Sequence, residues 1–322
     1  MNMLRRMSLV GLVLAFGLIA AACGGSESTD TTEGTVPPLE TTAAPAETTA
    51  APAAETTAAP EETTTTVAAF DLVAAVGEYE STIPEGWMSV GDVAAFKDAV
   101  ENSGALIIDV REPSEYEAGH MPGAVNISLR TLAASVDKIP ADTQVFIYCA
   151  SGYRAGLATS SLRLMGYDNV LAGPTYAAWT DAGEEVSTEA VEAAVVGDPG
   201  LAPELVAAAD GWLSTIPEGW QTAGDVEAVK AAVENGAFIL DVRTEGEYAE
   251  GHIEGAVNIP LRSLTANMDQ IPTDVQVIVH CKSGFRAALA MPVLNVLGFG
   301  STKAFTGSYL AWVEAGEPVV TG

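Results

Sequence analysis

Residues 144–154 read QVFIYCASGYR, and residues 276–286 read QVIVHCKSGFR. Each stretch is a short run rich in β-branched and aromatic residues that ends at a cysteine, followed by a small polar loop. Such a run predicts a buried strand, and the composition of residues 155–165 predicts that the first loop leads into a helix. One strand–loop–helix unit therefore occurs twice in the chain.

The duplication extends beyond the two cysteines. Three blocks recur in the same order, namely STIPEGW at 81–87 and 214–220, DVR at 109–111 and 241–243, and GAVNI at 123–127 and 255–259. The offset between the copies is constant from the DVR blocks to the arginines that follow the cysteines, and a single-residue gap precedes the DVR blocks. A period this long indicates two duplicated domains, since the units of a solenoid are about 20 to 50 residues long.

The composition divides the chain into distinct parts. Residues 24–69 are rich in Thr, Ala, Pro and Glu and contain no Lys or Arg. Such a segment has too little apolar surface to offset the entropy of ordering, so it is predicted to be disordered. We therefore expect a signal peptide at 1–22, a lipidated cysteine and a disordered tether at 23–69, one domain at 70–196, and a second at 203–322.

The first residues have the pattern of an export signal. Arg5 and Arg6 precede an apolar run at 9–22, which is shorter than the about 20 residues needed to span a bilayer. The run ends in small residues before Cys23 and resembles the lipobox of bacterial lipoproteins, although Ala20 stands where Leu is commonest. The resemblance implies a lipid on Cys23 and an extracytoplasmic, membrane-anchored protein. The alternative is an ordinary secretory signal with a leftover cysteine.

The charge is strongly acidic, with 43 Asp and Glu against 14 Lys and Arg and a net charge of -29. Nucleic acids and anionic lipid headgroups are excluded as partners, because both require basic patches. No Cys or His spacing suggests a zinc site, and no glycine-rich phosphate-binding motif is present, so we expect neither a metal nor a cofactor.

Each repeat alternates strands and helices. The expected strands lie at 105–108, 144–148, 237–240 and 276–280, and expected helices lie at 92–101 and 155–165. This alternation predicts an α/β fold in which each domain is a parallel sheet flanked by helices. Sites in such sheets form at the carboxyl ends of the strands, and both cysteines lie there.

A loop that enters a helix directs its backbone N–H groups inward, and these groups favour negative charge together with the helix dipole. A cysteine in that place is favoured as the thiolate, which attacks sulfur directly, and the persulfide that results is also an anion. Gly152 and Gly284 suit a tight loop with unusual backbone angles. Arg154 and Arg286 can brace the loop or supply a permanent cation.

We interpret Cys149 and Cys281 as nucleophiles rather than as buried core thiols, because both occur in the same strand–loop–helix context. A structural disulfide between them is disfavoured, since each cysteine would have to leave its own loop.

Together these motifs resemble the rhodanese family. The order is Asp-Val-Arg, then Glu-Tyr, Gly-His and Gly-Ala-Val-Asn-Ile, then Cys-x-Ser-Gly-aromatic-Arg, and both repeats show it over about three quarters of the chain. The resemblance implies two tandem rhodanese-like domains with a persulfide on Cys149 and Cys281. It also implies that the anion cradle is made by the loop amides of Ala150, Ser151, Gly152, Tyr153 and Arg154, and of Lys282, Ser283, Gly284, Phe285 and Arg286.

Other recurring polar and aromatic residues receive structural interpretations. We expect Asp109, Arg111, Asp241 and Arg243 to form polar networks that anchor loops near the site. His280 adjoins Cys281 but is replaced by Tyr148 in the first repeat, so it is interpreted as a strand-end residue rather than a base. His120 and His252 do recur, but neither is near a cysteine in the sequence, so we assign structural hydrogen bonds to both. Trp87, Trp179, Trp220 and Trp312 recur in pairs and are interpreted as packing residues.

Together with the two cysteine loops, the resemblance to the rhodanese family implies a sulfurtransferase that moves sulfane sulfur from thiosulfate or a persulfide donor to a thiol or cyanide acceptor. The expected partners are small sulfur anions and a thiol acceptor, and the membrane is contacted through the lipid anchor alone. One alternative is a non-catalytic module that binds or senses anions or polysulfide. Another is an arsenate reductase or phosphatase, whose loops have five residues between Cys and Arg where this chain has four.

The two loops differ in charge. Lys282 follows the second cysteine, whereas Ala150 follows the first. A lysine at the opening of the site would attract thiosulfate against the acidic background. We therefore expect the second domain to handle thiosulfate better, and the first to prefer a neutral or protein-borne persulfide.

Overall fold

The computed structural model of the chain describes residues 69–322. The expected signal peptide, the expected lipidation site at Cys23 and the expected tether up to residue 68 lie outside the described residues. Both repeats belong to one compact unit. Among residues 69–322 no helix is long and apolar enough to cross a membrane.

The first repeat contains a parallel sheet in the order β2-β1-β3-β4. Its strands are β1 (Leu106–Asp109), β2 (Val125–Asn126), β3 (Val145–Tyr148) and β4 (Val170–Ala172). Its helices are α1 (Leu72–Thr82), α2 (Val93–Ser103), α3 (Pro113–Glu117), α4 (Tyr153–Met165) and α5 (Tyr176–Asp181), with the 3-10 segments η1 (Leu129–Thr131) and η2 (Ala133–Lys138).

The second repeat has the same parallel order, β7-β5-β8-β9, and an antiparallel pair, β10-β6. Its strands are β5 (Phe238–Asp241), β6 (His252–Ile253), β7 (Val257–Asn258), β8 (Val277–His280), β9 (Lys303–Ala304) and β10 (Val319–Val320). Its helices are α6 (Pro203–Leu213), α7 (Val226–Glu234), α8 (Glu245–Glu250), α9 (Phe285–Val296) and α10 (Ser308–Glu314), with the 3-10 segments η3 (Leu261–Ser263) and η4 (Thr265–Gln270).

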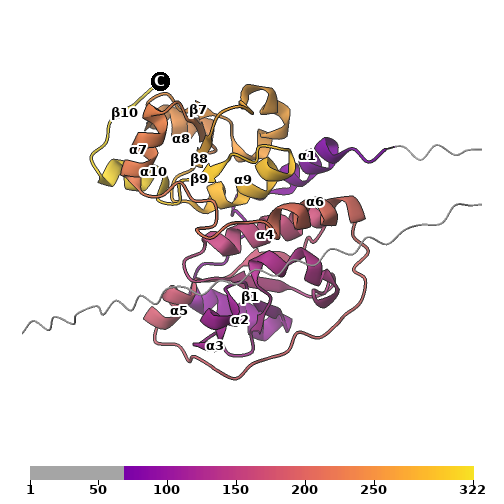
Figure 1. Cartoon of the computed structure of the whole chain (residues 1–322). Helices are drawn as coiled ribbons and strands as arrows, with labels where there is room; N and C mark the ends of the chain where they lie inside the picture. The colour runs from indigo at the N-terminus through magenta and orange to yellow at the C-terminus, as the bar shows by residue number, and fades with distance from the viewer. Residues whose placement is uncertain (1–68) are drawn as a thin grey trace, which may run out of the picture. The chain divides into compact units, whose positions relative to one another are not determined.

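The predicted α/β class is confirmed, with parallel sheets flanked by helices (Figure 1). The four predicted strands are present. Each cysteine directly follows a strand, β3 or β8, that pairs with the strand ending at the Asp of an Asp-Val-Arg block, β1 or β5. In the first repeat the parallel ladder pairs Asp109 with Tyr148, so β1 extends one residue beyond the predicted end at 108. The polar Asp109 is thereby fixed next to the residue that precedes Cys149.

Helices α4 and α9 pack directly against each other and join both repeats into one hydrophobic core. Nearly all of α4 is buried, because it also covers its own strands β3 and β4. Gly156 permits the close approach, since a Cβ atom there would lie 2.7 Å from the Cβ of Ala288 and 3.3 Å from the ring of Phe285. The Ser160 hydroxyl donates to the Leu289 carbonyl at 2.7 Å across the same contact.

The first helix of each repeat packs on the other repeat. Helix α1 contacts η3 and η4 of the second repeat, and α6 contacts η1 and η2 of the first. The buried carboxylate of Glu80 on α1 accepts hydrogen bonds from the Thr265 backbone N–H at 3.1 and 3.2 Å. On α6 the buried residues are Ala209, Trp212 and Leu213. This exchange was not predicted from the sequence.

The close approach at Gly156 gives a stability prediction. Alanine is favoured over glycine inside a helix, but at 156 its methyl group would overlap Ala288, so Gly156→Ala is expected to destabilise the chain by roughly 1–3 kcal/mol. Gly211→Ala in α6 is the matched control, because nothing lies within 4 Å of its added Cβ, and it is expected to stabilise by about 0.4–1 kcal/mol. Urea unfolding followed by circular dichroism measures both values. A stabilised Gly156→Ala would contradict the helix contact.

Candidate functional site

Cys149 lies at the end of β3, in the loop that leads into α4. The residue is 1% exposed, and its Sγ accepts hydrogen bonds from the backbone N–H of Gly152 at 3.1 Å and of Ala155 at 3.3 Å. Gly152 has a φ of 98°, which agrees with the expected unusual backbone angle. The start of α4 therefore directs amides at the sulfur, but one donor is Ala155, in the first turn of the helix and beyond the predicted loop.

Cys281 occupies the same place between β8 and α9 and is also 1% exposed. Its Sγ accepts a hydrogen bond from the Gly284 N–H at 3.1 Å. Gly284 has a φ of 101°, and a Cβ atom there would lie 2.2 Å from the Thr306 carbonyl oxygen, so a glycine is required. Cys149 and Cys281 are both free thiols.

The second site has an additional hydroxyl that sequence reasoning missed. The buried Ser308 accepts the Cys281 N–H at 3.1 Å, and its Oγ lies 3.8 Å from the Cys281 Sγ. The hydroxyl proton has a closer acceptor in the Phe305 carbonyl oxygen at 2.7 Å. Thr175 occupies this place in the first repeat, where it caps α5. The sequence offered one signal for Ser308. The second repeat has one additional residue before this serine, and the alignment of the repeats places Ser308 opposite Thr175 only when that insertion is allowed for.

The two loop arginines brace their loops. Arg154 donates two hydrogen bonds to the carboxylate of Glu115 on α3, at 2.5 and 2.7 Å, and Arg286 donates the same pair to Glu247 on α8. Paired parallel hydrogen bonds of this kind fix orientation as well as charge. Of the two roles left open by the sequence, the structure therefore shows bracing. The glutamates were not predicted as site residues, although the recurring Glu-Tyr pair was a signal for them.

These ion pairs remain charged at neutral pH. Hydrogen bonds from Arg286 lower the pKa of Glu247 to about 2, and hydrogen bonds from Arg154 lower the pKa of Glu115. Burial opposes the charge of Arg154, but its bonds to Glu115 and the nearby Cys149 raise its pKa above the ordinary value. The braces therefore hold throughout the pH range in which a thiolate can react.

The Asp-Val-Arg blocks form buried networks behind the cysteines. The Arg111 guanidinium donates to both oxygens of Asp109 at 2.6 to 3.0 Å and to the Gly119 carbonyl at 2.6 Å, and its Cζ lies 4.0 Å from the centre of the Tyr176 ring. The second repeat repeats this network with Asp241, Arg243, Gly251 and Tyr309. The geometry agrees with the interpretation that these residues anchor loops next to the site.

The histidines also lie where they were expected. His120 stacks on Tyr116 at 3.7 Å between ring centres, and its two ring nitrogens lie 2.9 and 3.0 Å from backbone carbonyl oxygens. His252 stacks on Tyr248 in the same way. The His280 ring is buried. Its Nε2 lies 3.6 Å from an Asp241 carboxylate oxygen, and its Nδ1 lies 3.2 Å from the Cys281 carbonyl oxygen.

The tryptophans fall into two classes. Trp179 and Trp312 are buried within their own repeats, and their indole N–H groups donate to the carbonyls of Glu185 and Pro318. They are the packing residues that the sequence suggested. Trp87 and Trp220 are half-buried and pack against the shared core, as expected, and in addition each ring lies under arginines of the opposite repeat.

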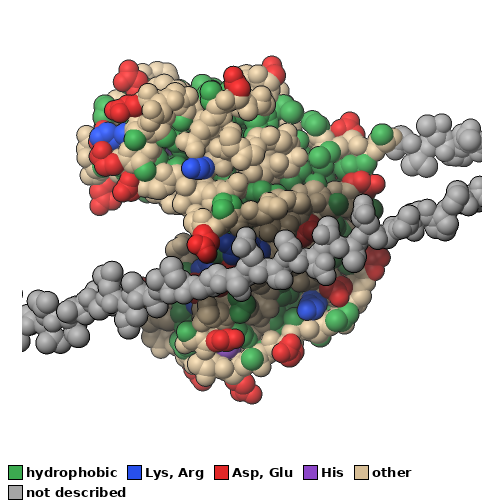
Figure 2. All heavy atoms as spheres, viewed as in Figure 1, with side chains coloured by type: hydrophobic (Ala, Val, Ile, Leu, Met, Phe, Trp, Pro, Cys, Tyr) green, Lys and Arg blue, Asp and Glu red, His purple; other side chains and the backbone are tan. Residues whose placement is uncertain are grey.

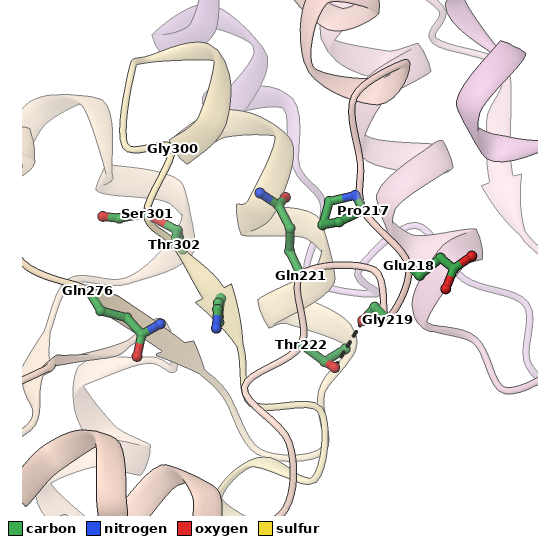
Figure 3. Close-up of a pocket in the computed structure, with 10 residues that line it drawn as sticks. Pro217, Glu218, Gly219, Gln221, Thr222, Gln276, Gly300, Ser301 and Thr302 are labelled. Atoms are coloured by element: carbon green, nitrogen blue, oxygen red, sulfur yellow. Dashed lines mark hydrogen bonds between the residues drawn. The ribbon is translucent and has the colours of Figure 1, made fainter. Parts of the chain in front are cut away.

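The two cysteine loops share one pocket. It is lined by Ser151, Gly152, Tyr153, Ser283, Gly284, Phe285, Thr306 and Gly307. A different pocket lies between residues 217–222 and residues 300–303 (Figure 3), and its lining contains no cysteine. Acidic side chains are scattered over the face seen in Figure 2, where basic side chains are few. A small anion would therefore depend on local cations and amides near the loops.

Comparison with known families accounts for this geometry. A family model for the rhodanese-like domain matches residues 92–173 and 225–315, which include both cysteines and their loops. The chain belongs to the rhodanese-like domain family. Each repeat thus carries one rhodanese-like domain, and the sequence resemblance is confirmed at that level.

Relatives of the rhodanese-like domains include named sulfurtransferases. An Allochromatium vinosum protein named sulfurtransferase is 34% identical over 83 residues, which are 26% of this chain and 78% of the relative. An Arabidopsis thaliana protein named thiosulfate sulfurtransferase 18 is 34% identical over 112 residues, covering 30% of this chain and 82% of the relative. Two Bacillus subtilis relatives are matched over only about half of their length.

Among solved structures, one described as the rhodanese fold of Escherichia coli 3-mercaptopyruvate sulfotransferase is similar to this chain at 22% identity and a TM-score of 0.35. The match covers 69% of this chain and 98% of the solved chain. A likeness this low supports no statement about activity.

Buried His280 gives a pH prediction. Burial lowers its pKa below the ordinary value of about 6.5, so below that pH the unfolded chain binds more protons than the native state. Stability should therefore fall as the pH falls from about 6.5, by up to about 1.4 kcal/mol per pH unit for this one group. His280→Gln is expected to reduce the difference in urea stability between pH 7.5 and 5.5.

Glu247→Gln is the control for this measurement. The depressed pKa of Glu247 places its stabilising effect above about pH 4.5, and that effect is lost as the pH falls toward about 2. Its replacement should leave the difference between pH 7.5 and 5.5 unchanged. An unaltered pH difference in His280→Gln would refute the assignment to His280.

Proposed function

We propose that the chain is a sulfurtransferase that carries sulfane sulfur as a persulfide on Cys149 and Cys281. The donor is thiosulfate or another persulfide, and the acceptor is a thiol or cyanide. The observation that carries the proposal is the hydrogen bonding of each cysteine Sγ by backbone N–H groups where a helix begins. Membership of the rhodanese-like family and the named sulfurtransferase relatives support it.

The reaction balances without an added oxidant. The cysteine thiolate attacks the outer sulfur of thiosulfate, a new sulfur–sulfur bond forms, and the original one breaks as sulfite leaves with the electron pair. An acceptor thiolate then attacks the outer sulfur of the cysteine persulfide, and the cysteine leaves again as the thiolate. With cyanide the product is thiocyanate. In both steps the Gly152 and Gly284 amides stabilise an anion at a fixed position.

The loop length disfavours oxyanion chemistry. Four residues separate Cys149 from Arg154, and four separate Cys281 from Arg286. The arginine side chains are also engaged by Glu115 and Glu247. A wide cradle for a tetrahedral arsenate or phosphate is therefore the weaker interpretation.

We also propose a location for the protein, independently of its activity. The apolar run at 9–22 and the small residues before Cys23 support a lipoprotein signal, with the mature protein anchored outside the cytoplasmic membrane by lipid on Cys23. The acidic charge supports the expectation that nucleic acid is not a partner.

Mass spectrometry after thiosulfate treatment tests the proposed transfer. The peptides that contain Cys149 and Cys281 are each expected to gain the mass of one sulfur atom and to lose it again when cyanide or a thiol is added. Cys149→Ser and Cys281→Ser should each abolish the gain on their own peptide. If neither peptide gains sulfur in the intact chain, the non-catalytic binding module becomes the better assignment.

The difference between the two loops gives a kinetic prediction. Lys282 is exposed in the second loop, while Ala150 is the corresponding residue in the first. With thiosulfate and cyanide as substrates, Cys281→Ser is expected to remove more turnover than Cys149→Ser. In the Cys149→Ser chain, where the second site acts alone, Lys282→Ala should raise the KM for thiosulfate by about tenfold or less. Ala150→Lys in the Cys281→Ser chain is the reciprocal control and should lower KM. Equal losses in the two serine variants would contradict the proposed difference.

A further inference from the structure

The STIPEGW segments, residues 81–87 and 214–220, connect helices on one repeat to sheets on the other. Helix α1 packs on the second repeat, but the residues directly after the first segment return to the first sheet. There Ala172 donates to the Met88 carbonyl at 2.8 Å, and Val90 donates to the Ala172 carbonyl at 2.7 Å. The chain therefore passes from one repeat to the other within the segment.

The second segment makes the reverse passage. Helix α6 packs on the first repeat, and the residues after the segment join the edge of the second sheet. Ala304 donates to the Gln221 carbonyl at 2.9 Å, and Ala223 donates to the Ala304 carbonyl at 2.8 Å. The two passages are thus related by the repeat itself.

Backbone strain marks both passages. Trp87 and Met88 have φ values of 55° and 57°, and Trp220 and Gln221 have φ values of 57° and 54°. Consecutive non-glycine residues in the left-handed region are unfavourable and persist only where the surrounding structure imposes them. In both copies the strained pair begins with the tryptophan that closes the segment.

Trp220 lies at the first site although it belongs to the second repeat. Its ring lies under the guanidinium Cζ of Arg130 at 4.2 Å and of Arg154 at 5.0 Å. The Tyr153 hydroxyl donates to the Trp220 carbonyl at 3.1 Å, and Arg130 donates to the Ile216 carbonyl at 2.9 Å. Arg154 and Tyr153 are both residues of the Cys149 loop, so the segment is held by the loop itself.

Trp87 has the equivalent place at the second site. Its ring lies 4.8 Å from the Cζ of Arg286 and 5.4 Å from the Cζ of Arg262. Phe285 stands where the first loop has Tyr153, so it has no hydroxyl for the corresponding bond to the segment. Each repeat therefore places a tryptophan against the loop arginine of the other repeat. The hydrogen bond from the loop tyrosine to the tryptophan carbonyl is present at the first site and has no counterpart at the second.

We propose that each tryptophan is a positioning residue for the active site of the opposite repeat, Trp220 for Cys149 and Trp87 for Cys281. Ring faces attract guanidinium groups, so each indole orients two arginines beside a cysteine loop. At the first site both arginines are also ion-paired, Arg130 with Glu112 and Arg154 with Glu115. A guanidinium has several N–H groups, so those not bonded to the glutamates can still face an anion, and the substrates favoured in this way are anions. The catalytic consequence rests on the proposed sulfurtransferase function, whereas the crossed placement does not.

Alkylation of the full-length chain tests the crossed assignment without requiring turnover. Iodoacetate is an anion and iodoacetamide is neutral, so the ratio of their rates at one cysteine reports the cations near it. Trp220→Leu is expected to lower this ratio about threefold to tenfold at Cys149 and to leave it unchanged at Cys281. Trp87→Leu is expected to show the opposite pattern, and peptide mass spectrometry reads both cysteines in one sample.

Trp220→Phe and Trp87→Phe are the matched controls, because each keeps a ring face under the arginines. Both should remain closer to the wild-type ratio than the leucine variants, and circular dichroism should show that all four variants are folded. In single-cysteine chains, the leucine change should raise KM for thiosulfate at the opposite site more than it lowers kcat. A folded Trp220→Leu that affects Cys281, both cysteines equally, or neither would overturn the proposal.

The two proposals fail separately. A crossed alkylation pattern with no persulfide on either cysteine removes the sulfurtransferase function and retains the crossed placement. Persulfide on both cysteines with an uncrossed pattern removes only the role of the tryptophans.

Discussion

The contact between α4 and α9 is the constraint on which the two sites depend. Gly156 and Ala288 bring the helices so close that a side chain added at Gly156 would overlap its neighbour. Each helix begins at a cysteine loop, so the contact also brings the two loops to one pocket. The same packing gives α1 and α6 their places on opposite repeats, and the segments that follow them reach the opposite loops.

Each site combines fixed hydrogen-bond donors and ion pairs with a buried cysteine. Main-chain amides hold each sulfur, ion pairs to Glu115 and Glu247 hold each loop, and the Asp-Arg networks hold the neighbouring strand ends. Amide donors are fixed by the helix, so in the proposed transfer they would not have to reorganise as the sulfur changes between thiolate and persulfide. In this acidic protein the groups that favour an anion are therefore local to the two cysteine loops.

Much of each half could be predicted from particular residues. Runs of apolar residues ending at Asp109 and Cys149 predicted β1 and β3, since side chains buried on both faces leave a continuous hydrophobic pattern. Gly152 predicted a left-handed position, because few other residues adopt one. Ala155 was missed as a donor to the Cys149 sulfur because it acts through its main-chain N–H, and Ser308 was missed as a neighbour of Cys281 because it follows an inserted residue.

The sequence by itself determined the duplication, the α/β class and the two sulfur-bearing loops, because these follow from short local patterns that recur at a nearly fixed offset. Only the tertiary structure decided that α1 and α6 exchange places and that Trp87 and Trp220 lie at the opposite sites. An identical STIPEGW segment satisfies the same local pattern whether it packs on its own repeat or on the other. The choice depends on contacts between residues far apart in the chain, such as Glu80 with Thr265, which no local pattern records.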